Sequence, residues 1–224
     1  MNRLSAFIRS LPPAVEFGIV ALTAFALPVV GSLMQAADPP AEPLYDPAGL
    51  RDLVIWEVLV MLVLGWFLMM RGWDFARQPL YPSWIECGLG LTLACGILLG
   101  WSLLWPVIQF VLPPQDVVEA PFAPGLDWPT LIAACIVNPV FEEWLVCAYI
   151  ISAIRRPLGL GLAIAVSVSI RAAYHTYQGP VGFIYAFAIG LIFAIWFVRT
   201  RQLWPLVVAH GALDFIGLLD SALA

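Results

Sequence analysis

Seven apolar segments, each close to the length of a membrane span, occupy most of this 224-residue chain. About 20 apolar residues are needed to cross the hydrocarbon core of a bilayer. The segments are residues 15–36, 53–70, 84–112, 130–153, 158–176, 181–198 and 203–222. Only 11% of the residues are charged, whereas a soluble domain has roughly 25%. The sequence therefore predicts an all-α polytopic membrane bundle that forms one integral membrane domain over residues 1–224.

The third segment, residues 84–112, is long for a single span and contains Pro106. Proline removes a backbone hydrogen bond inside a helix and introduces a clash with the preceding turn. This segment is expected to be kinked, tilted or split into two pieces. A split would raise the predicted number of helices from seven to eight.

Arginines and acids alternate between the loops that join the apolar segments. The arginines are Arg3 and Arg9, Arg71 and Arg77, Arg155 and Arg156, and Arg199 and Arg201. The alternate loops carry mainly acids, namely Asp38, Glu42 and Asp46, then Asp116, Glu119 and Asp127. Since cytoplasmic loops carry an excess of basic residues, this pattern predicts a cytoplasmic N-terminus. No basic patch suggests a nucleic-acid partner.

Two adjacent acids, Glu142 and Glu143, lie inside the fourth apolar segment. Two charges at the centre of a bilayer cost about 5 to 7 kcal/mol on insertion scales unless they are neutralised or paired. Neighbouring helix positions differ by about 100°, so the two side chains are expected to point in different directions. Pro139 precedes them and is expected to bend or open the helix.

The two histidines of the chain also lie in apolar segments that carry other polar residues. His210 and Asp214 are four residues apart, as are Arg171 and His175, so each pair shares a helix face. Together with the two acids, these pairs predict one polar site at which three helices converge. Such a site could bind a metal or stabilise an oxyanion.

At these positions the chain resembles the CPBP family of intramembrane proteases, which includes CAAX-processing enzymes and Abi-like relatives linked to bacteriocin processing. The resemblance covers roughly residues 130–218, which would form the catalytic core. The motif Glu-Glu-x-x-x-Arg matches Glu142 and Glu143, and Phe-x-x-x-His matches His175. The third motif, His-x-x-x-Asn or Asp, matches His210 and Asp214.

The resemblance implies an intramembrane endopeptidase in a bacterial inner membrane, acting on a membrane-associated protein or peptide. By resemblance, Glu143 and His175 would activate water and Glu142 would support the site. His210 and Asp214 would stabilise the oxyanion. Alternatively, Glu143, His175, His210 and Asp214 would hold one divalent metal such as zinc. A glutamic and a metal-dependent protease both remain open at this point.

Two residues depart from the family pattern. Cys147 stands where the first motif has arginine, and Arg171 stands where the second has phenylalanine. We hypothesise that Arg171 supplies, from a neighbouring helix, the guanidinium that position 147 lacks. The alternative is that Arg171 only extends toward the membrane surface.

Two other functions fit the same residues. The chain could be an inactive membrane scaffold or immunity protein of this fold, or a proton-coupled transporter that uses the acids and histidines as a relay. Glu57, in the second apolar segment, is a further acid that could face a water-filled cavity. Residue counting places His175 near the outer end of its span, away from Glu143 and His210. A tilted helix, a re-entrant segment or a different helix boundary would bring them together.

Overall fold

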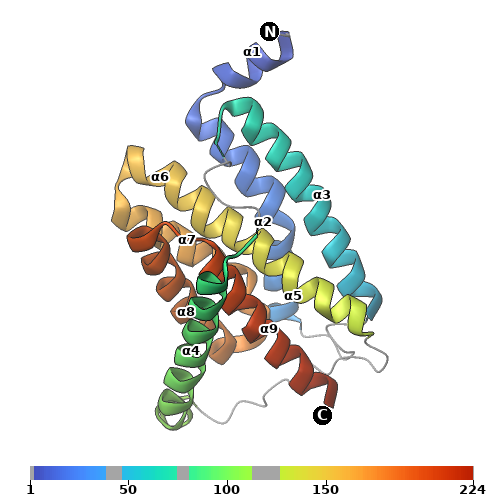
Figure 1. Cartoon of the computed structure of the whole chain (residues 1–224), viewed down its shortest axis with the longest axis vertical. Coiled ribbons are helices and arrows are strands. Elements are labelled where there is room, and N and C mark those ends of the chain that lie inside the picture. The colour runs from blue at the N-terminus through green and yellow to red at the C-terminus, as the bar shows by residue number, and fades with distance from the viewer. Residues whose placement is uncertain (1–2, 39–46, 75–80, 113–126, 224) are drawn as a thin grey trace.

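The computed structural model describes residues 3–38, 47–74, 81–112 and 127–223, and these contain helices but no strand (Figure 1). The predicted all-α bundle is therefore confirmed. The α-helices are α1 (Arg3–Ser10), α2 (Pro13–Ala37), α3 (Pro47–Arg71), α4 (Trp84–Val111), α5 (Trp128–Glu142), α6 (Ile151–Leu158), α7 (Leu160–Tyr174), α8 (Gly179–Thr200) and α9 (Trp204–Leu223). A π-helix, η1 (Glu143–Ile150), and a 3₁₀ turn, η2 (Thr176–Gln178), complete them.

Each of the seven predicted segments corresponds to a helix or a continuous run of helices. Five are long and apolar enough to cross a membrane, namely Pro13–Ala37, Pro47–Arg71, Trp84–Val111, Trp128–Leu158 and Thr176–Thr200. The other two, α7 and α9, are shorter apolar helices. Helix α4 continues through Pro106 without a break, so the predicted split into two pieces is wrong.

One long helical run, formed by α5, η1 and α6, crosses the middle of the molecule (Figure 1). It begins at Trp128 because Asp127 caps it, accepting the backbone N–H of Thr130. This hydrogen bond lowers the pKa of Asp127, since it stabilises the carboxylate. The run stays continuous at Pro139 and widens into the π form from Glu143. Short π-helical segments are rare and often occur at functional sites.

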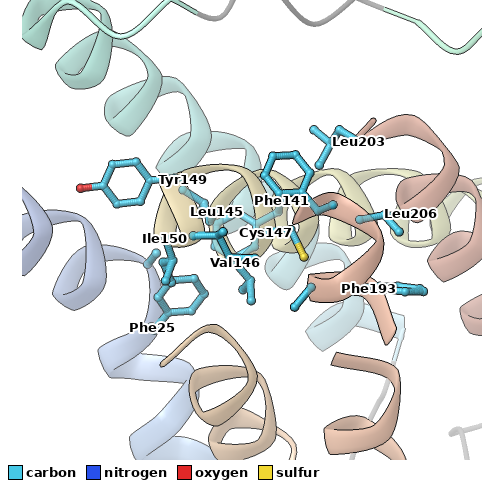
Figure 2. Close-up of a cluster of buried hydrophobic side chains, with 14 of the residues drawn as sticks. Phe25, Phe141, Leu145, Val146, Cys147, Tyr149, Ile150, Phe193, Leu203 and Leu206 are labelled. Atoms are coloured by element: carbon cyan, nitrogen blue, oxygen red, sulfur yellow. The ribbon is translucent and has the colours of Figure 1, made fainter. Parts of the chain in front are cut away.

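The π-helix lies in the hydrophobic core of the bundle. Figure 2 shows its side chains surrounded by residues from other helices, and Cys147 lies among them. The labelled neighbours outside the π-helix are Phe25 on α2, Phe141 on α5, Phe193 on α8, Leu203 just before α9, and Leu206 on α9. The polar groups on this helix are therefore enclosed by apolar side chains and must find their partners within the protein.

The N-terminal helices are joined to this core by a cluster around Glu16 on α2. Its carboxylate accepts hydrogen bonds from Arg71 Nε at 2.5 Å and from Trp73 Nε1 at 2.8 Å. Tyr149 of the π-helix donates to the same carboxylate at 3.3 Å. Arg71 also donates to the backbone carbonyls of Ile8 and Arg9. These contacts attach α1, α2 and α3 to one end of η1.

A glycine allows α9 to approach α5 closely. Pro139 has no N–H, so the carbonyl of Cys135, four residues earlier, lacks its usual helical donor. A Cβ atom at Gly211 would collide with that carbonyl oxygen. Gly211 therefore lets the two backbones meet, and it brings the neighbouring His210 up to the start of the π-helix.

Replacing Gly211 with alanine should push α9 away from α5. We expect a loss of stability of about 1 to 3 kcal/mol, the range typical of overpacking. The measurement is the thermal unfolding midpoint of the purified protein in detergent. Gly217→Ala is the matched control on the same helix, because a Cβ atom there meets open space. Equal midpoints for the two variants would contradict the close approach.

Candidate active site

Arg171 connects the two adjacent glutamates from the neighbouring helix α7. Its NH2 lies 2.6 Å from Glu143 Oε1, and its NH1 lies 3.3 Å from Glu142 Oε2. The residue is only 2% exposed, so the alternative that it extends to the membrane surface is wrong. The geometric part of the hypothesis, a guanidinium supplied from across the helix interface, is confirmed.

The two carboxylates do not point apart as expected from their positions in the sequence. Both reach the same guanidinium, because this group presents five N–H donors in a planar fork and can bind two acceptors at once. Cys147, one turn after Glu143, places its Sγ 3.2 Å from Glu143 Oε2. Positions 147 and 171 therefore face the same carboxylate from two helices.

Helix α8 accommodates the Arg171 side chain. A Cβ atom at Gly190 would lie 3.0 Å from Arg171 Cδ, so the absence of a side chain there leaves room for the arginine. The ring of Phe193 lies 5.6 Å from the guanidinium carbon, within the range of a cation–π contact. Arg171 is thus held between two acids and the surface of α8.

His210 on α9 completes this side of the site. Its Nδ1 lies 2.8 Å from Glu143 Oε1, and its Nε2 lies 3.4 Å from Asp214 Oδ1. The 2.8 Å contact is a hydrogen bond and places a proton between Nδ1 and the Glu143 carboxylate, whereas the 3.4 Å contact with Asp214 is an ion-pair distance. The Asp214 side chain is 28% exposed, whereas Glu143 is 0% exposed. His210 therefore links the buried end of the site to its open edge.

His175 lies beside Glu142 rather than Glu143. Its Nε2 is 4.0 Å from Glu142 Oε2, and its side chain is 20% exposed. His175 lies just past the end of α7 at Tyr174, where a turn begins, and from there it reaches Glu142. That turn is held by Ser32 on α2, whose hydroxyl accepts the backbone N–H of Tyr177 at 2.9 Å.

Sequence reasoning missed two partners of Glu142. The Tyr174 hydroxyl donates to Glu142 Oε2 at 2.6 Å, and the Asn138 amide lies 3.3 Å from Glu142 Oε1. The sequence could have indicated the contact of Asn138, because this residue is one helical turn before Glu142. Tyr174 directly precedes the motif histidine. Glu57, which the sequence suggested could face a water-filled cavity, is instead 1% exposed and joins the site, because Asn138 donates to its Oε1 at 2.7 Å.

The residues with the spacing of metal ligands are Glu142, Glu143 and His210, whose ligand atoms all lie within 4.8 Å of one another. However, the Arg171 guanidinium already binds both carboxylates, and Glu143 Oε1 also contacts His210. A divalent cation at these oxygens would lie next to the positive charge of Arg171, and the repulsion would be strong because no water screens it in this buried site. The donor set therefore fits a protein cation better than a metal.

Residues 124–216 match the model of the family described as type II CAAX prenyl endopeptidase Rce1-like. The match covers less than half of the chain but includes all three motif segments, and it confirms the resemblance to CAAX-processing proteases that the motifs indicated. No curated protein and no solved structure matches the chain. The family match makes this segment similar to CAAX proteases, and the five long apolar helices support an integral membrane protein.

Proposed function

We propose that this protein is an intramembrane CAAX-type endopeptidase in which Glu142 and His175 activate a water molecule. The observation that carries the proposal is the 4.0 Å separation between Glu142 Oε2 and His175 Nε2. This distance is too long for a direct hydrogen bond and leaves room for a water molecule between the Glu142 carboxylate group and the His175 ring. His175 is partly exposed, so water can reach this pair.

Glu142 is a better candidate for the general base than Glu143, to which the resemblance assigned this role. A carboxylate offers about four acceptor positions. Tyr174 and Arg171 bind Glu142 Oε2, and Asn138 binds Oε1, so the acceptor position that remains for water is on Oε1. Glu143 also has three partners but is 0% exposed, so water has no access to it. We assign Glu143 the role of holding Arg171 and His210 in place.

The proposed reaction is hydrolysis of a peptide bond. Glu142 takes a proton from the water held between it and His175, and the water oxygen forms a bond to the carbonyl carbon of the substrate. The negative charge that develops on the carbonyl oxygen is stabilised by the Nε2–H group of a protonated His210, whose Nδ1–H is held by Glu143. Glu142 then returns its proton to the leaving nitrogen as the C–N bond breaks, which restores the carboxylate.

This reaction requires no metal, because Arg171 supplies the positive charge at the two glutamates. We therefore expect o-phenanthroline or EDTA to leave the cleavage rate of the purified protein unchanged. The measurement is the initial rate after dialysis against each chelator, with a known zinc protease treated in parallel as the control. Loss of activity on dialysis and its recovery on adding zinc would contradict the metal-free assignment.

The substrate proposed is a membrane-associated protein or peptide with a prenylated C-terminal C-a-a-X sequence. We further propose that residues 130–218 form the catalytic core of one membrane domain. The arginine pattern supports a cytoplasmic N-terminus. Several residues of that pattern, namely Glu42, Asp46, Arg77, Asp116 and Glu119, lie outside the described residues.

A peptide-release assay tests the proposal. The purified protein in liposomes is given an S-farnesylated C-a-a-X peptide, and mass spectrometry follows release of the C-terminal tripeptide. We expect release by the wild type. Absence of release would contradict this substrate assignment and favour the inactive scaffold, or the transporter if the same liposomes show proton flux.

A further inference from the structure

Glu57 is a buried acid on α3, outside the segment that matches the protease family. It is 1% exposed. Its Oε1 accepts a hydrogen bond from Asn138 Nδ2 at 2.7 Å, and its Oε2 has no partner among the described residues. A buried carboxyl group without a charged partner lowers stability. Its hydrogen bond to Asn138, which also contacts Glu142, points to a role in the site.

Asn138 lies between Glu57 and Glu142. The same amide nitrogen that binds Glu57 lies 3.3 Å from Glu142 Oε1. An amide nitrogen carries two hydrogens, so it can donate one to each acid. If the amide turned over, its carbonyl oxygen would instead face both carboxyl groups. An acceptor at position 57 therefore favours the orientation in which the N–H group faces Glu142.

We propose that Glu57 is a positioning residue, which orients the Asn138 amide so that it donates to Glu142. This inference rests on the proposed function. The amide occupies one acceptor position of Glu142 Oε1, while Tyr174 and Arg171 bind Oε2. The remaining acceptor position of the base is then fixed in space, which is where the reacting water must bind.

The test compares two substitutions at Glu57 by their effect on cleavage of the S-farnesylated C-a-a-X peptide. Glu57→Gln keeps a carbonyl acceptor for Asn138, and we expect kcat to stay near the wild-type value. Glu57→Ala removes the acceptor, and we expect kcat to fall about 10- to 100-fold, as is typical when a supporting hydrogen bond is lost. KM should not change, because Glu57 does not touch the substrate.

A double-mutant cycle tests whether Glu57 acts through Asn138. Asn138→Ala should lower kcat about as much as Glu57→Ala. The double variant should then be no slower than Asn138→Ala alone, because the two residues share one pathway. Independent, multiplying losses would overturn the proposal.

Glu16→Ala provides a matched control, since Glu16 is another buried acid, in the cluster that holds α1, α2 and α3. It should lower the unfolding midpoint without changing kcat of the folded fraction. If Glu57→Ala behaved in this way, its role would be structural only. If Glu57→Gln were as slow as Glu57→Ala, the acceptor role would be wrong. A wild type that releases no tripeptide would instead overturn the proposed function itself.

Discussion

Replacing Glu142 with glutamine is expected to lower kcat by about 100- to 10,000-fold, the range for loss of a general base. Glutamine has nearly the same shape, so the contacts of Tyr174 and Arg171 can still form around it, but it cannot take a proton from water. KM should change little. The measurement is the steady-state rate of tripeptide release from the farnesylated peptide, with enzyme concentration taken from the folded fraction.

The same substitution at Glu143 separates the two acids. Glu143 is enclosed by Arg171, Cys147 and His210. Glu143→Gln removes one of the two charges paired with Arg171, so we expect a lower unfolding midpoint and a smaller loss of kcat than for Glu142→Gln. A fully folded Glu143→Gln without activity, beside an active Glu142→Gln, would return the role of base to Glu143.

Arg171→Ala is expected to be the most destabilising substitution in the site. It leaves Glu142 and Glu143 buried without their shared cation, and removal of one partner from a buried ion pair typically costs about 3 to 5 kcal/mol. Activity should fall with it, because both carboxylates lose their orientation. The measurements are the unfolding midpoint in detergent and the rate of peptide cleavage by the folded fraction.

Cys147→Ala is the matched control, because Cys147 contacts the same carboxylate but carries no charge. We expect a small effect on both quantities. A sharper test moves the guanidinium back to the place it has in the family motif, with the double variant Cys147→Arg, Arg171→Phe. Partial recovery relative to Arg171→Phe alone would support the relocated cation. Small and equal effects of Arg171→Ala and Cys147→Ala would contradict it.

The positions and order of the apolar helices followed from the sequence because apolar length is a strong signal in a chain with so few charges, although only five of the seven predicted segments form helices long enough to cross a membrane. Pro106 was a weaker guide, since α4 continues through it. The π-helix could not be predicted, because no composition or period distinguishes it from an α-helix. Its presence beside the two glutamates became visible only from the backbone hydrogen bonds.

The motif spacings predicted which residues belong to the site, but they did not predict which of these residues contact one another. Spacing places His210 and Asp214 on one face, and the structure keeps that pair together. It cannot show that His175 faces Glu142, because this depends on where α7 ends and on the turn held by Ser32. Glu57 is 81 residues from Asn138 in the sequence, so their contact depends on how α3 packs against α5.

The most direct test of the central claim compares the N-termini and C-termini of proteins in membranes of cells that produce the wild type or Glu142→Gln at matched levels. Mass spectrometry of both kinds of terminus detects internal cleavage sites and the loss of C-terminal tripeptides. We predict new termini, or loss of C-terminal tripeptides from membrane-associated proteins, with the wild type alone. Identical profiles from two folded proteins, in a host that contains the natural substrates, would contradict an intramembrane endopeptidase that works through Glu142.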